Sequence, residues 1–189
     1  MIQLGSYALG RHGFFYPDGS IITIPAAGTG SVAGASSRTN KPDPTDPLYI
    51  DLGACDDWQD DIKSSGDEKI WKPSPGRRQL YQVIEKGAEA TIKMTTEEMQ
   101  AFAAQVYYRT SQKLTQIGGN QQFNPLSAPP MNGWFHQECY DQYNAFAFSY
   151  DVYSLIRITG GMASKEGGII KPQWEINVLF STLNTGAVA

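Results

Sequence analysis

The chain has only two cysteines and two histidines among its 189 residues, and no apolar run long enough to cross a membrane. Cys55 and Cys139 are far apart in sequence and form no CxxC pair, so free buried thiols are favoured over a disulfide. Two such cysteines do not determine whether the protein works in a reducing or an oxidising compartment. A membrane span needs about 18 consecutive apolar residues. Residues 1–10 show neither the basic nor the apolar region of a secretion signal. We therefore expect a protein without a membrane anchor, made in a cytoplasm.

Motifs for catalysis and for phosphate binding are also missing. No Walker sequence is present, and no G-x-G-x-x-G joins a strand to a helix. His12 follows Arg11 near the start of the chain, and His136 lies in an alternating segment. A lone histidine of this kind is more often a packing or surface residue than a base, since no nucleophile is placed beside it. The sequence predicts no catalytic residue, no cofactor and no metal site, and a protein that is not an enzyme.

Charge is nearly balanced. Nineteen acidic and fifteen basic residues give a net charge of −4, which argues against a dedicated nucleic-acid binder with its basic patch. The acidic run from Asp56 to Asp61 lacks the register and the distal glutamate of a calcium loop. We interpret it as a solvated, self-repelling turn, and the pair Arg77 and Arg78 as charge that protects a strand end.

What the chain does contain is strand-period alternation. From Ala145 to Ile158, apolar residues at most even positions alternate with a mixed set at odd positions. Ordinary strands have about 5 to 6 residues. A strand of this length outruns the core of a small domain, so we expect another copy of the chain to cover its ends. Hydrophobic residues make up 41% of the chain, which is enough for one domain spanning residues 1–189.

Shorter segments predict further strands. We expect a hairpin that joins residues 14–16 to 21–24 around a Pro-Asp-Gly turn, since proline and glycine preset such turns. A second hairpin is expected to pair residues 80–84 with residues 88–94, whose Ala88, Ala90, Ile92 and Met94 point inward. The remaining strands are expected at residues 48–53, 69–72, 133–140 and 173–180, the last with Trp174, Ile176 and Val178 in the core.

Two long polar segments interrupt these strands. Residues 25–47 are rich in Gly, Ser, Thr and Pro and bury too little apolar surface to order alone. We expect them to be a flexible loop, or an arm that orders on contact, within an N-terminal region 1–47 that precedes a β-core 48–189. Residues 111–132 form the second long loop, and loops of this length are usually functional or disordered.

One helix is expected, at about residues 96–110. Thr95 and Glu98 have the spacing of a capping box, which supplies acceptors to the free amides of a helix start. The following apolar residues recur at helical spacing and predict one buried stripe. These residues are Met99, Phe102, Ala103, Val106 and Tyr107.

The order of these parts resembles the major tail tube proteins of long-tailed bacteriophages. The resemblance covers the chain from about Leu48 onward. It is carried by residues 49–53 (YIDLG), 69–73 (KIWKP), 88–98 (AEATIKMTTEE), 133–136 (GWFH), the long strand and residues 174–182.

The resemblance implies a β-sandwich or barrel-like domain with one flanking helix and long loops. It implies a structural virion protein whose six copies form a ring, and rings that stack into a hollow tube. Its partners would be further copies of itself, a tape-measure protein and other tail proteins, with transient, non-specific passage of genomic DNA. Assembly would take place in the host cytoplasm, and a mildly acidic chain suits a lumen that repels phosphates.

Other interpretations remain open. A tail terminator or a tube-completion protein would stop at one ring. A β-sandwich carbohydrate-binding module would use exposed tryptophans, although the missing secretion signal argues against it. An enzyme would need scattered acids such as Glu138, Asp141 and Asp151 to converge in space.

Overall fold

The computed structural model describes residues 8–28, 30, 32–65, 68–74, 77–84, 87–97, 99–116, 122–160 and 171–188. Within these ranges the chain forms eleven strands and one helix. The elements are β1 (Ala8–Pro17), β2 (Ile21–Ile22), β3 (Gly34–Ala35), β4 (Ile50–Ser65), β5 (Glu68–Ser74), β6 (Arg77–Ile84), β7 (Gly87–Thr96), α1 (Ala101–Tyr108), β8 (Met131–Asp141), β9 (Phe146–Ile158), β10 (Gln173–Val178) and β11 (Thr185–Val188).

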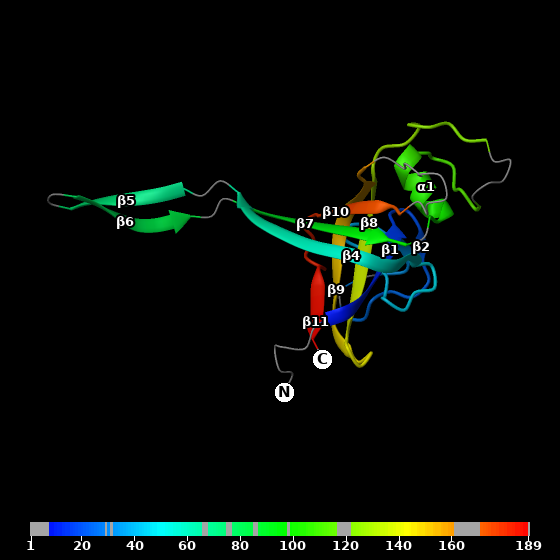
Figure 1. Cartoon of the computed structure of the whole chain (residues 1–189), viewed down its shortest axis with the longest axis horizontal. Helices are drawn as coiled ribbons and strands as arrows, with labels where there is room; N and C mark the ends of the chain where they lie inside the picture. The colour runs from blue at the N-terminus through cyan, green and yellow to red at the C-terminus, as the bar shows by residue number, and fades with distance from the viewer. Residues whose placement is uncertain are drawn as a thin grey trace.

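Six of the strands close into an antiparallel barrel (Figure 1). Around the ring the order is β10, β7, β4, β1, β8 and β9, and pairing of β9 with β10 closes it. Strand β11 adds to β9 outside the ring, whereas β2 with β3 and β5 with β6 form separate two-stranded sheets. The expected fold class, a mainly β, barrel-like domain with one flanking helix, is confirmed.

The barrel interior is a continuous apolar core. Inward-pointing residues of the six strands meet there because successive side chains of a strand alternate between its faces. Helix α1 packs its buried residues Phe102, Ala103 and Val106 into the same core. The strand residues of the core are Phe15, Leu52, Ile92, Met94, Phe135, Ile156, Trp174 and Ile176.

A second apolar cluster covers the outer face of β8 and β9. Tyr16, Ile22, Trp134 and Tyr153 pack together there. The Trp134 indole N–H donates to the carbonyl of Ser37, so the N-terminal loop is fastened to this face. On the odd-numbered side of the long strand, Asp151 and Tyr153 are therefore buried as well.

The long strand lies where the sequence predicts it, but its expected partner is wrong. Strand β8 pairs with β9 from Met131 opposite Ile156 to Tyr140 opposite Phe146. On the other edge, β10 covers Ser154 to Ile158 and β11 covers Phe148 to Asp151. The chain itself covers β9 because the barrel closes and the C-terminal tail returns as a strand, which the sequence analysis had treated as a short tail.

Both predicted hairpins have the wrong partners. The turn after Pro17 is present, with Gly19 at a φ of 82°, but β1 pairs with β8 and β4 while β2 pairs with β3. Strand β6 pairs with β5, and β7 pairs with β4 and β10. Alternation identifies strands and their faces but carries no information about which strand lies next to which. The inward positions of Ile92 and Met94 are confirmed, whereas Ala90 is half-buried and Ala88 is exposed.

The helix is shorter than predicted. It begins after Gln100, which makes no side-chain cap hydrogen bond, and it ends at Arg109 in the left-handed conformation. Thr95 and Thr96 belong to β7 instead, where Thr95 pairs with Gln173 and Thr96 Oγ1 accepts a hydrogen bond from the Trp174 indole. Ladder pairing therefore overrides the capping-box signal, and Glu98 lies outside the described residues.

Much of the N-terminal region that the sequence marks as flexible is ordered against its own barrel. Asp46 accepts hydrogen bonds from the backbone amides of Thr23, Ile24 and Leu48. Burial alone would raise the pKa of Asp46, but these amides hold it below its usual value. Asn40 also bridges Val32 and Ala35. Buried polar side chains thus order a segment with little apolar surface.

The second long loop has neither helix nor strand in its described part, 111–116 and 122–130.

The acidic run is a strand and not a turn. Residues 56–61 continue β4, pairing with β7 up to Ser65 opposite Gly87. Cations offset the repulsion: Asp56 pairs with Lys171, Asp60 with Arg11 and Asp61 with Lys63.

Candidate assembly surface

Strands β4 and β7 run far beyond the barrel. β4 pairs with β1 only between residues 50 and 54, and β7 pairs with β10 only between residues 91 and 95. Past these points the two strands have only each other, and β5 with β6 continue the ribbon outward (Figure 1). We call residues 62–90 the arm.

The arm exposes apolar side chains. Ile62 is 76% exposed, Ile70 37% and Trp71 50%. A two-stranded ribbon is at best marginally stable in water without a third strand or a packed layer. Exposed strand edges also favour pairing with other chains unless they are protected. Among the described residues, therefore, neither a third strand nor a packed layer covers the arm, although such a ribbon needs one.

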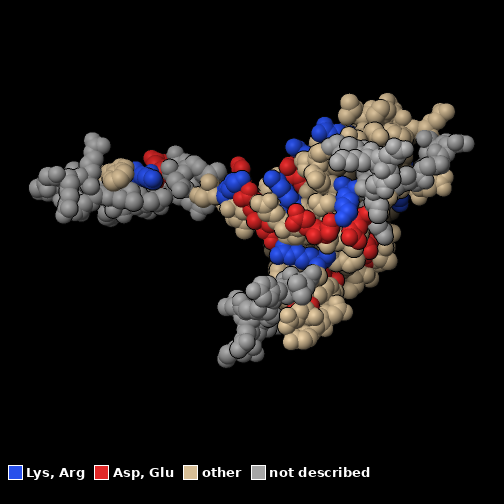
Figure 2. Space-filling model, viewed as in Figure 1, with Lys and Arg blue, Asp and Glu red and all other residues tan. Residues whose placement is uncertain are grey.

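The base of the arm combines an apolar pocket with paired charges. A pocket of about 250 Å³ lies where β4, β7, β9 and β10 meet, lined by Ile62, Ile92, Tyr150 and Val178 among others. At its rim the Arg11 guanidinium donates to Asp60 at 3.1 Å. Figure 2 shows acidic and basic side chains side by side over this part of the barrel, so no single sign of charge covers the visible face.

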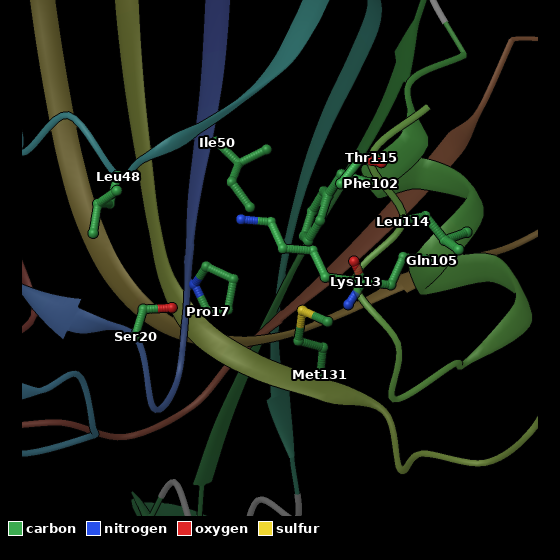
Figure 3. Close-up of a pocket in the computed structure, with 10 residues that line it drawn as sticks. All are labelled: Pro17, Ser20, Leu48, Ile50, Phe102, Gln105, Lys113, Leu114, Thr115 and Met131. Carbon is green, nitrogen blue, oxygen red and sulfur yellow. The ribbon is translucent and has the colours of Figure 1, made fainter. Parts of the chain in front are cut away.

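A larger pocket of about 500 Å³ lies beside α1. Its wall is mostly apolar, and Lys113 extends across it toward Ile50 (Figure 3). Lys113 is the one ionisable residue among the described residues that line this pocket, so these residues include no acid–base pair. The lining residues are Pro17, Ser20, Leu48, Ile50, Phe102, Gln105, Lys113, Leu114, Thr115 and Met131.

The two histidines lie on the outer side of the barrel. His12 contacts Asp51 at 2.6 Å and stacks on Phe14. His136 is buried, with Nδ1 2.7 Å from Asp151 and Nε2 3.3 Å from Glu138. The sequence predicted no role for either histidine, and the contact of His136 with Asp151 could not be predicted because it joins strands that no local pattern pairs.

A buried ionic network surrounds His136. Lys41 Nζ donates to Asp151 at 2.8 Å and to the Thr185 hydroxyl at 2.6 Å. Burial raises the pKa of Asp151, but hydrogen bonds from His136 and Lys41 outweigh it and hold the pKa below its usual value. Burial by itself lowers the pKa of His136, and its contacts with Asp151 and Glu138 reverse this, so the pKa is raised.

The acids that an enzyme would require do not all converge. Glu138 and Asp151 both contact His136, whereas Asp141 accepts hydrogen bonds from the amides of Tyr143 and Ala145 and so shapes the β8–β9 turn. Among the described residues no group of three or more His, Cys, Asp or Glu side chains is placed to hold a metal ion.

The tryptophans and cysteines differ in how deeply they are buried. Trp134 and Trp174 are fully buried and Trp58 is half-buried, which leaves Trp71 as the one exposed tryptophan. The core position predicted for Trp174 is confirmed, and a platform of several tryptophans for a sugar is not formed. Cys55 and Cys139 are free thiols, as favoured, but only Cys139 is buried and Cys55 is half-buried; burial raises the pKa of each to about 11.

Comparisons with known proteins add no family. The sequence matches no protein-family model and no curated protein. No helix in the described part of the chain has the length and apolar character needed to span a membrane.

Proposed function

We propose that the protein is a structural subunit of a bacteriophage tail tube, which forms hexameric rings that stack into a hollow conduit for DNA. The observation that carries the proposal is the arm, a two-stranded ribbon with exposed Ile62, Ile70 and Trp71 beyond a closed barrel. A two-stranded ribbon without a third strand or a packed layer is at best marginally stable in water. A subunit whose neighbours cover the ribbon buries this apolar surface on assembly.

The sequence resemblance supplies the kind of assembly. Residues 49–53, 69–73 and 88–98, which carry much of the resemblance, lie in or next to β4, β5 and β7. A contact between different surfaces of identical subunits closes into a ring when the rotation allows it, and otherwise continues as a filament. In the proposed tube, contacts within each ring close, and contacts between rings through the arms let the tube lengthen.

The charge balance agrees with a conduit. A net charge of −4 leaves no overall attraction for phosphates, and basic side chains on β1 and β4 are engaged by acidic neighbours. DNA that passes through such a lumen is not retained by counterion release. A tape-measure protein and other tail proteins would be the further partners, and the assembled protein would reside in the virion.

Electron microscopy tests the proposal. Negative-stain images of the concentrated, purified protein are expected to show rings and hollow tubes of variable length. Single rings that never stack would favour a tail terminator or a tube-completion protein. Dispersed monomers at every concentration, in the presence of virion extracts that contain the other tail proteins, would contradict the proposal.

A further inference from the structure

The network around His136 joins four elements of the chain. Lys41 comes from the N-terminal loop, His136 and Glu138 from β8, Asp151 from β9 and Thr185 from β11. We call these five residues the latch. Their contacts link the loop and the C-terminal strand to the outer face of the barrel.

The latch supplies the side-chain hydrogen bonds of Thr185, the first residue of β11. All four residues of β11 are exposed, and the strand pairs with β9 alone. Its first residue, Thr185, accepts the hydrogen bond from Lys41 Nζ at 2.6 Å. Because β11 buries little apolar surface, its position depends on its four-residue ladder, on this anchor and on Asn184 just before it, whose side chain accepts from the Tyr153 amide and donates to the Leu179 carbonyl.

His136 is enclosed by charged and aromatic groups from every neighbouring element. Asp151 and Glu138 contact its two ring nitrogens, and Lys41 lies across Asp151. The rings of Phe14 on β1 and Tyr49 before β4 lie 5.9 and 6.0 Å from the imidazole. The titratable groups around it are therefore two carboxylates, one ammonium group beyond Asp151, and the Tyr49 phenol.

We propose that the latch is a pH-sensitive fastening, in which the protonated His136 bridges Asp151 and Glu138 and so holds the Lys41 loop and β11 on the barrel. Loss of the proton leaves a neutral ring beside two carboxylates, the buried Asp151 and the half-buried Glu138. The Lys41–Asp151 pair still holds the loop, but the ring of His136 no longer offsets the negative charge of the two carboxylates. The loop and β11 open more often, and the cluster of Tyr16, Ile22, Trp134 and Tyr153 becomes accessible.

The direction of the pH effect follows from linkage. The folded pKa of His136 lies above its ordinary value of 6.5, so its contribution is complete below pH 6.5 and is lost as the pH rises through the folded pKa. The folded pKa of Asp151 lies below 3.8, so its contribution is complete above pH 3.8 and is lost as the pH falls through that lowered pKa. The latch is therefore most stable between about pH 3.8 and pH 6.5, and it opens more often as the pH rises through the folded pKa of His136.

Hydrogen–deuterium exchange tests this effect in the intact chain between pH 6 and 9, after correction for intrinsic exchange. Backbone amides of residues 40–47 and 185–188 are expected to lose protection as His136 deprotonates. The total increase in opening is tenfold for each pH unit by which the closed-state pKa exceeds the open-state pKa. His136→Asn, which keeps an amide donor near Asp151 but cannot titrate, is expected to show low, pH-independent protection.

The chain offers a matched control because it has only one other histidine. His12 also contacts a carboxylate, Asp51, but lies outside the latch, so His12→Asn should keep the pH dependence of the unaltered chain. Protection that stays flat from pH 6 to 9, or a pH dependence that survives in His136→Asn, would overturn the proposal. If His136→Asn fails to fold, an NMR titration of His136 in the unaltered chain decides: its midpoint must coincide with that of the protection loss.

Discussion

The barrel and the arm use the same kind of strand in opposite ways. In the barrel each strand has a neighbour on both edges and one face in a closed core, which Trp174 and Phe135 fill at 1% and 0% exposure. In the arm, β5 and β6 have only each other, and Trp71 is half exposed. The chain thus contains one region that is complete by itself and one that is complete only with a partner. This contrast predicts that equivalent substitutions act on folding in the barrel and on assembly in the arm.

The largest contrast is expected between two tryptophans. Trp174→Ala removes a buried indole that stacks on Phe102 and donates to Thr96 at 2.9 Å, and we expect it to lower the free energy of unfolding by about 3–5 kcal/mol. Trp71→Ala is expected to change it by less than about 0.5 kcal/mol while weakening assembly. Denaturant unfolding and sedimentation velocity measure the two effects. Equal destabilisation by both substitutions would show that the arm is part of the folding unit.

Removing the buried cation is expected to have a similar effect on the barrel's outer layer. The Lys41 side chain is 3% exposed and pairs with Asp151. Lys41→Met leaves Asp151 and His136 without this partner, and loss of one member of a buried pair costs about 3–5 kcal/mol. Lys171→Met, at the exposed pair with Asp56, is the matched control and should leave the unfolding midpoint unchanged. A Lys41 variant as stable as the control would mean that the latch is not needed for folding.

Two glycines sharpen the comparison of inner and edge strands. A Cβ on Gly133 in β8 would lie 2.2 Å from the carbonyl oxygen of Tyr16, whereas a Cβ on Gly186 in β11 would meet its nearest atom, the Ser149 carbonyl oxygen, at 3.6 Å. Gly133→Ala should therefore destabilise the fold by about 3 kcal/mol, the upper part of the range for overpacking, and Gly186→Ala only slightly. Thermal unfolding compares them, and equal melting temperatures would contradict the close approach of β1 and β8.

The smallest effect is expected where the barrel meets the arm. Arg11 pairs with Asp60 at 3.1 Å and lies over the Trp58 ring, but both charged side chains are partly exposed. Arg11→Gln should lower the free energy of unfolding by about 0.5–1 kcal/mol, as for partly exposed ion pairs. The loss should shrink at high salt, since salt screens exposed charges. A loss of several kcal/mol would place this pair in the core of the fold.

Local pattern was sufficient to predict the faces of strands but not their neighbours. The alternation of residues 145–158 and of 173–180 predicted β9 and β10 and the inward residues Ile156 and Trp174, although β10 ends at Val178 and Phe180 is exposed. Pairing is non-local: β1 joins β8 across more than a hundred residues, and nothing in residues 14–24 encodes that choice. The acidic run was misinterpreted because its counterions, Arg11 and Lys171, are distant in sequence.

The candidate surface was only partly predictable for the same reason. Residues 69–73 were identified as a strand and as part of the resemblance, but their projection from the barrel depends on where β1 and β10 stop pairing. The latch was missed entirely, because Lys41 lies in a segment whose composition predicts flexibility. This segment has little apolar surface to bury, and the buried polar side chains of Lys41, Asn40 and Asp46 order it instead.

Deletion of the arm tests the central claim most directly. Asp61 of β4 pairs with Thr91 of β7, so replacing residues 62–90 with Asn-Gly joins two paired residues by the tight turn that suits a hairpin. Sedimentation velocity over a range of concentrations should show the full chain forming rings and larger assemblies. The deleted chain should remain a folded monomer with the unfolding midpoint of the barrel unchanged. A deleted chain that assembles like the full chain, or that no longer folds, would contradict the claim that the barrel folds alone and the arm serves assembly.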